Sequence, residues 1–119
     1  MPPSGSRLRV KRDADITQVE FVDRNILDEA NIQQIGEEIS GLIDAEKTPH
    51  LLISFSNVDH LSSAALGTLI TINNKVKNKG GKLRLANIDP QIYEVFKITK
   101  LDKLFQIHDS TDRAKASFK

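Results

Sequence analysis

The chain has 119 residues, of which 39% are apolar and 28% charged, and this composition is typical of one small globular domain. Its 17 basic and 16 acidic side chains leave a formal net charge of +1, which argues against a nucleic-acid-binding protein. No apolar run approaches the ~20 residues of a membrane span, and residues 1–10 lack the apolar centre of a secretory signal. The chain contains no cysteine. We therefore expect a cytosolic protein without membrane insertion, disulfides, thiolate metal sites or cysteine nucleophiles.

The first residues predict a short tail followed by a hairpin. Residues 1–6 (MPPSGS) offer nothing to bury, so we expect a disordered tail there and a single domain over residues 7–119. Leu8 to Arg12 alternates apolar and basic side chains, as half-exposed strands do. After a tight turn at residues 13–15, the β-rich stretch from Ile16 to Val22 is predicted to return antiparallel, at one edge of the sheet.

A polar connection and an amphipathic helix come next. Residues 23–30 (DRNILDEA) are predicted to form a surface connection. Asn31 is expected to cap a helix, with Gln34 at the third position as a weak capping box. The helix is predicted over residues 31–46 because apolar side chains recur at helical spacing along it, namely Ile32, Ile35, Ile39, Leu42 and Ile43.

The stretch from Leu51 to Gly67 (LLISFSNVDHLSSAALG) joins a strand to a helix. Residues 51–55 predict a central strand buried on both faces, and residues 56–60 predict a polar corner. Ser62 and Ser63 follow at the start of a helix that is expected to reach about Asn78 and to end at Gly80-Gly81. Its predicted inner stripe is Ala65, Leu66, Leu69, Ile70, Ile72 and Val76.

The remaining chain predicts strand, helix, strand and helix. Residues 82–87 form a strand, and Asp89 caps a helix whose first residue is Pro90. A last strand is expected near residues 105–108, before a final helix that starts near residues 109–111. The order ββαβαβαβα predicts an α/β domain, with a mixed, mainly parallel sheet, an N-terminal hairpin and about four covering helices. The expected inner residues of the last two helices are Ile92, Val95, Phe96, Ala114 and Phe118.

Ser62 and Ser63 are the candidate functional residues, because open α/β sheets usually carry their working residues at the carboxyl ends of strands. A serine at a helix start is most often simply an N-cap. It is also well placed for phosphorylation, which adds about −1.5 to −2 charges. The helix dipole tolerates this charge, whereas an apolar or acidic partner surface over the same corner does not. Phosphorylation would then end partner binding and leave the fold intact.

Catalytic and ligand-binding signals are weak elsewhere. Ser63 does not stand in a G-x-S-x-G motif, and nothing in the pattern joins it to a histidine. Gly80-Gly81 lacks the spacing of a phosphate-binding loop, and Asp13 and Asp15 are expected to be turn residues rather than metal ligands. We therefore expect no catalytic residue, cofactor or metal site. The three histidines, His50, His60 and His108, fall at predicted strand edges or corners.

The stretch from Val58 to Gly67 (VDHLSSAALG) resembles the STAS domain family, named for sulfate transporters and anti-sigma factor antagonists. The likeness is closest to bacterial anti-sigma factor antagonists, which typically carry Asp-Ser-Ser/Thr-Gly-Leu-Gly between a corner and a helix. Residues 80–83 (GGKL) and 96–105 (FKITKLDKLF) also resemble that family, so the resemblance covers residues 8–118. Ser62 stands where the family has Asp, and Ala65 replaces a Gly, which is expected to add a methyl group at the surface.

The resemblance implies a STAS fold and a regulatory binding protein that is not itself an enzyme. Its implied partners are an anti-sigma factor with an ATP-binding kinase fold, which phosphorylates Ser63 and so ends the binding, and a serine phosphatase that restores it. Ser62 is the alternative phosphoacceptor. The residues expected to contact the partner are Asp59, His60, Leu61, Ser62, Ser63 and Leu66.

Two other interpretations remain open at this point. The domain can be a non-switching STAS subunit beside a transporter ATPase or in a stress-signalling scaffold, in which case Ser63 is only a helix cap. A small hydrolase or nucleotide-binding enzyme is a third interpretation. Turnover that depends on Ser63, or a nucleotide bound by the isolated protein, would support it.

Overall fold

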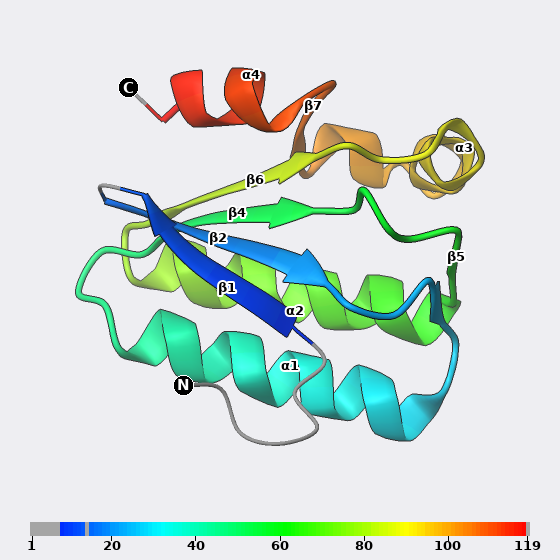
Figure 1. Ribbon diagram of the computed structural model, residues 1–119, viewed down its shortest axis with the longest axis horizontal. Coiled ribbons are helices and arrows are strands. Elements are labelled where there is room, and N and C mark those ends of the chain that lie inside the picture. Colours follow the sequence, from blue (N-terminus) through cyan, green and yellow to red (C-terminus); the bar gives the residue numbers. More distant parts are fainter. Residues whose placement is uncertain (1–7, 14, 119) are drawn as a thin grey trace.

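The sheet of this protein has the predicted mixed character. The computed structural model describes residues 8–13 and 15–118, and within this part of the chain five strands form one sheet in the order β1-β2-β4-β6-β7 (Figure 1). The predicted tail at residues 1–6 and Ala14 of the predicted turn lie outside the described residues. The strand bounds are β1 Leu8–Asp13, β2 Ile16–Phe21, β4 His50–Ser54, β6 Lys82–Ala86 and β7 Gln106–His108.

The strand pairing confirms the expected topology. β1 pairs antiparallel with β2, so that Val10 lies opposite Val19. β2, β4, β6 and β7 then run parallel, with Val19 opposite Ile53 and Ile53 opposite Leu85. The carboxyl ends of β2, β4 and β6 therefore meet at one edge of the sheet, which is where the corner after β4 begins.

Helices cover the two faces of the sheet unequally. α1 (Glu29–Asp44) and α2 (Ser63–Asn78) lie side by side on one face, while the short α4 (Thr111–Ala116) lies on the other (Figure 1). α3 (Pro90–Ile98) and the short 3₁₀ helix Leu101–Lys103 lead from β6 to β7. In the described part of the chain, no helix is long and apolar enough to cross a membrane.

β4 is the centre of the fold because it is buried on both faces, as its apolar run predicts. Leu51 and Ile53 belong to the main core, which α1 and α2 cover. Leu52 points to the other face and packs against a smaller cluster that includes Ala114 and Phe118. All three strand residues are 2% exposed or less, so the end of β4 is a rigid base for the corner that follows.

The predicted end of α2 at Gly80-Gly81 is confirmed. Gly80 adopts φ +73°, a left-handed conformation that glycine accepts without strain. The N–H of Gly80 donates to the Lys77 carbonyl and that of Gly81 to the Val76 carbonyl, both at 2.9 Å. A Cβ at Gly81 would overlap the Pro49 carbonyl oxygen, so glycine is required there as well.

The connection predicted over residues 23–30 is wrong in part, because it contains a strand. β3 (Asn25–Ile26) pairs in parallel with β5 (His60–Leu61), which lies inside the corner after β4. Ile26 is only 2% exposed and joins the main core. Strands of two residues are too short to show an alternating pattern, so they could not be predicted from the sequence.

The predicted N-cap of α1 is also wrong. Asp28, not Asn31, caps the helix: its Oδ1 accepts from the N–H groups of Ala30, at 2.8 Å, and Asn31, at 3.3 Å. Because α1 begins at Glu29, Asn31 is already a helical residue. Both Asp and Asn are good caps, so propensity alone does not choose between them.

The inner face of α3 is narrower than predicted. Ile92 and Phe96 are 4% and 0% exposed, as expected, whereas Val95 is 37% exposed. A helix of nine residues that lies at the end of a sheet buries one narrow stripe rather than a broad face. The outward position of Val95 becomes important at the candidate site.

We predict that Asp28→Ala lowers the free energy of unfolding by about 1 kcal/mol, because two N–H groups at the start of α1 lose their acceptor. Asn31→Ala is the matched control and should change it by less than about 0.5 kcal/mol. Urea denaturation of the two variants measures both values. An equal loss in both would contradict the assignment of Asp28 as the cap.

Candidate functional site

Ser62 is the N-cap of α2. Its backbone is extended (φ −86°, ψ 167°), and its Oγ accepts a hydrogen bond from the N–H of Ala65 at 3.2 Å. Its carbonyl accepts the N–H of Leu66, also at 3.2 Å, which is the first backbone bond of the helix. The half-buried Ser62 side chain therefore has the structural role that a serine at this place most often has.

Ser63 is the first residue of α2 and is exposed. Its hydroxyl stands beside the positive end of the helix dipole, where added negative charge is tolerated. From Ser63 to Asn74 the chain has no charged side chain, and the basic residues of α2 come only afterwards, at Lys75 and Lys77. A phosphate on Ser63 would therefore introduce a formal charge into an uncharged part of the helix.

The corner before Ser62, residues 56–61, is attached to the segment that follows β2. The N–H groups of Asp59 and His60 donate to the Arg24 carbonyl at 2.7 and 3.3 Å, and the N–H of Ser62 donates to the Ile26 carbonyl at 3.1 Å. The side chain of Val58 is 2% exposed and anchors the corner in the main core. These contacts between segments that are distant in the sequence fix the position at which α2 begins.

An exposed ion pair between Arg24 and Asp59 also attaches the corner to the segment after β2. Arg24 donates from Nε and Nη2 to Oδ2 of Asp59, at 2.9 and 2.8 Å. The side chains are 74% and 43% exposed, so solvent screens the pair and its contribution to stability is small. Its chemical effect is to neutralise the carboxylate beside the start of α2.

A groove lies between the corner and α3. Leu27 and Val95 form its apolar rims and are 55% and 37% exposed. His60 and Gln91 contribute polar groups, so the groove combines apolar contact area with hydrogen-bonding capacity. Its lining residues are Leu27, Asp59, His60, Leu61, Gln91, Ile92 and Val95.

The structure gathers most of the residues expected to contact a partner. Asp59, His60 and Leu61 line the groove, and Ser62 and Ser63 follow at the helix start. Leu66 is an exception: it is 6% exposed and packs in the main core, so it is wrong as a contact residue. Ala65 is 5% exposed, so its methyl group also faces the core rather than the surface.

The sequence did not reveal the contributions of Arg24, Leu27, Gln91 and Val95 to this site. Leu27 offered a weak signal, as an apolar residue in an otherwise polar connection. Val95 was assigned to the core, and nothing in the sequence placed α3 opposite the corner. These residues reach the site only through the tertiary arrangement.

Of the candidate catalytic and metal-binding side chains, His50 and Asp13 have structural contacts away from Ser63, whereas His60 lies in the adjoining corner. His50 starts β4, at the end of the strand opposite to the corner, and its ring stacks on that of Phe118 with centroids 5.6 Å apart. Asp13, which was predicted in the turn, is the last residue of β1 and forms an ion pair with Lys115 at 2.6 Å. Each of these side chains thus has a structural contact away from Ser63.

Comparisons with known proteins identify the family and the fold. The STAS domain family model matches residues 9–114. BtrV of Bordetella bronchiseptica, which is named as an anti-sigma factor antagonist, is 25% identical over 96 residues, or 81% of this chain and 82% of BtrV. The anti-sigma-B factor antagonist of Bacillus subtilis is 32% identical over 63 residues, or 53% of this chain and 58% of that protein.

A solved structure shares the fold. The anti-sigma-factor antagonist (STAS) domain protein from Planctomyces limnophilus superposes with a TM-score of 0.85 at 21% identity. The superposition covers 93% of this chain and 97% of that one. At 21% identity, this similarity shows a shared fold and does not by itself show a shared function.

We predict that Ser62→Ala lowers the free energy of unfolding by about 1 kcal/mol, because the N–H of Ala65 loses its acceptor. Ser63→Ala should change it by less than about 0.5 kcal/mol, since Ser63 is an exposed first helical residue. Urea denaturation under identical conditions compares them. A larger loss for Ser63→Ala would assign the cap to Ser63 instead.

Proposed function

The chain belongs to the STAS domain family, and from this premise we propose that it is a cytoplasmic anti-sigma factor antagonist that regulates transcription by switching partners. The corner and the adjoining groove bind an anti-sigma factor, and phosphorylation of Ser63 ends that binding. The names of the curated relatives from Bordetella and Bacillus support the antagonist role.

The observation that carries the proposal is the separation of two roles between adjacent serines. Ser62 caps α2, whereas Ser63 is exposed at the first helical position. A phosphate on Ser63 therefore leaves the cap of the helix in place. Phosphorylation of Ser62 would have to place the phosphate on the half-buried side chain that caps α2, which makes Ser62 the weaker candidate.

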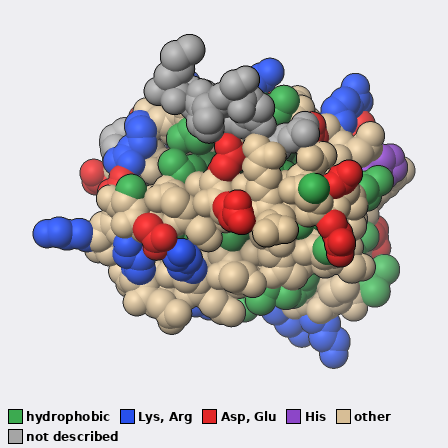
Figure 2. All heavy atoms as spheres, turned by 90° about the horizontal axis from the view of Figure 1, so that it is seen from below, with side chains coloured by type: hydrophobic (Ala, Val, Ile, Leu, Met, Phe, Trp, Pro, Cys, Tyr) green, Lys and Arg blue, Asp and Glu red, His purple; other side chains and the backbone are tan. Residues whose placement is uncertain are grey.

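The surface around Ser63 suits a protein partner. An ordinary interface buries ~800 Å² on each partner, more than the corner alone offers, so the groove rims and the exposed side of α2 must take part. That side of α2 is uncharged from Ser63 to Asn74. Figure 2 looks onto the α1/α2 layer, where uncharged surface dominates and Asp and Glu side chains stand apart from one another.

The partner in this proposal is an anti-sigma factor with an ATP-binding kinase fold. Ser63 Oγ attacks the γ-phosphorus of bound ATP, the new O–P bond forms as the bond to the β–γ bridging oxygen breaks, and ADP leaves. The hydroxyl proton passes to a base of the kinase. A separate serine phosphatase uses water to release inorganic phosphate and restore the hydroxyl. The chain contributes the acceptor, and both catalysts are partner proteins.

We predict that Ser63→Asp weakens binding to the anti-sigma factor by at least about 1.4 kcal/mol, a tenfold change, because a carboxylate enters an uncharged contact surface. Its melting temperature should stay close to that of the wild type, since the helix dipole tolerates the charge. Pull-downs from the native cytosol with wild-type, Ser63→Ala and Ser63→Asp baits identify the partner, and titration calorimetry then measures its affinity.

Ser63→Ala is the control in this experiment and should hold the same ATP-binding protein as the wild type. If all three baits hold it equally, the switch is absent and the non-switching STAS subunit becomes the better description. Turnover or nucleotide binding by the isolated chain that depends on Ser63 would instead support an enzyme.

We also predict that Leu27→Ser combined with Val95→Ser weakens partner binding at least about tenfold, because both rims of the groove lose apolar contact area. Val10→Ser is the matched control: Val10 is 46% exposed, as an apolar residue on the edge strand β1. Affinities from calorimetry compare the variants. A similar loss from Val10→Ser would place the contact surface elsewhere.

A further inference from the structure

We propose that Asn57 is the positioning residue of the corner: its side-chain amide holds residues 56–61 against the end of β2, so that Ser63 is presented in one geometry to the partner kinase. The inference deepens the proposed function and rests on it for the role of Ser63. Its structural part, the attachment of the corner, can be measured on the isolated chain.

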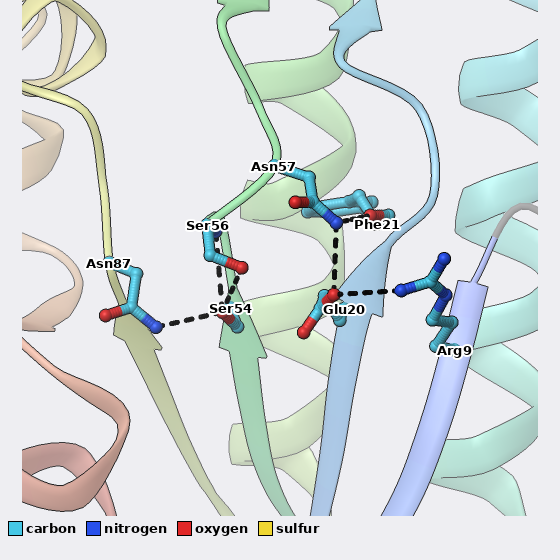
Figure 3. A network of polar contacts seen from close by, with 7 residues as sticks. All are labelled: Arg9, Glu20, Phe21, Ser54, Ser56, Asn57 and Asn87. Atoms are coloured by element: carbon cyan, nitrogen blue, oxygen red, sulfur yellow. Dashed lines mark hydrogen bonds and ion pairs between the residues drawn. The ribbon is translucent and has the colours of Figure 1, made fainter.

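The contacts of Asn57 cross from the corner to the edge hairpin (Figure 3). Its Nδ2 donates to Oε1 of Glu20 at 3.0 Å and to the carbonyl of Phe21 at 3.4 Å. Glu20 Oε1 also lies 3.6 Å from Nη1 of Arg9, on β1. The Asn57 amide thus joins the chain after β4 to β2 and, through Glu20, to β1.

The chemistry of these contacts requires a donor at position 57. Both acceptors are oxygen atoms, one from a carboxylate and one from a backbone carbonyl. An amide can donate to both, whereas a carboxylate of the same shape can donate to neither and would repel Glu20. A hydrogen bond to a charged acceptor is also stronger than one between neutral groups.

The corner depends on such attachment because it buries little. Among residues 56–61, Val58 is the buried side chain, and the rest are half-buried or exposed. Its attachments also include the backbone bonds to Arg24 and Ile26, the Ser54–Ser56 hydrogen bonds, the packing of Leu61 against the main core and the exposed Arg24–Asp59 ion pair. Segments with few buried contacts open locally at low cost, so one partly buried hydrogen bond to a carboxylate changes how often this corner opens.

Position matters for the proposed reaction. Phosphoryl transfer relies largely on alignment of the acceptor oxygen with the γ-phosphate, and a misplacement of 1 Å can lower the rate on the order of 10²-fold. Ser63 follows the corner directly, and the N–H of Ser62 is itself bonded to the Ile26 carbonyl. Displacement of the corner from β2 therefore displaces the phosphoacceptor.

The test compares Asn57→Asp, Glu20→Gln and the double variant. Asn57→Asp replaces the donor by a carboxylate facing Glu20. Glu20→Gln keeps an oxygen that accepts from Asn57, so the corner should stay attached much better than in Asn57→Asp. In the double variant the glutamine amide at position 20 can donate to the carboxylate at position 57, which restores the bond with reversed polarity. Ile43→Val, a truncation of a fully buried residue in the last turn of α1, controls for a general loss of stability.

Hydrogen exchange of the isolated proteins at pH 7 gives the first readout. Asn57→Asp should raise the exchange rates of the Asp59, His60 and Ser62 amides about tenfold relative to those of β6, and the double variant should reverse most of this increase. Ile43→Val should not raise the exchange rates of the corner amides relative to those of β6. Unchanged corner amides in Asn57→Asp, or an increase spread evenly over the chain, would overturn the proposal.

Phosphorylation of Ser63 by the purified partner and ATP gives the second readout. Asn57→Asp should lower kcat about tenfold, with partial recovery in the double variant and little change in Ile43→Val. Faster exchange with unchanged kcat would overturn the positioning role. If wild type and Ser63→Asp bind the partner equally, the proposed function fails, and the exchange result still decides whether Asn57 holds the corner.

Discussion

The attachment of the corner to the chain after β2 is the interaction on which the candidate site depends. The corner side of this contact comprises residues 56–62, and the other side residues 20–26, which include β3. Neither segment has regular structure long enough to be stable alone. Together they form a separate two-stranded parallel sheet, β3 with β5, and fix the point where α2 begins. The position of Ser63 is therefore a property of the tertiary structure, although the motif around it is local.

The division between Ser62 and Ser63 explains how such a corner can be modified without unfolding. A cap has to keep its oxygen beside the N–H of Ala65, and Ser62 satisfies this with a half-buried side chain. The next residue occupies the first helical position and is exposed to solvent. A single serine would have to keep its capping hydrogen bond while it carried a phosphate on a half-buried side chain. Two adjacent serines remove the conflict.

Much of the fold could be predicted from the sequence, since the long elements carry strong periodic patterns. β4 and the inner stripes of α1 and α2 are examples. Features with short patterns were missed or misplaced. β3 and β5 have only two residues each, and the choice of Asp28 over Asn31 as the helix cap depends on where β3 ends. Val95 was predicted to face the core because apolar character alone does not show which face a short helix buries. Leu66 was predicted to contact a partner because it belongs to the motif. The helical spacing had already placed it beside the core stripe, and in the structure it packs in the core.

The energies at the start of α2 favour a switch that acts on binding rather than on folding. Charge near a helix N-terminus stabilises an exposed site by about 0.3–1 kcal/mol, so a phosphate on Ser63 changes the folded state little. Burial of the same phosphate against an apolar or uncharged surface would cost far more, because a charge loses its hydration without a partner. No basic side chain lies between Ser63 and Asn74 to compensate, and Arg24, the cation bonded to the corner, is already paired with Asp59. Under the proposed function, the difference between these two costs would allow a single modification to separate the two proteins while each remains folded.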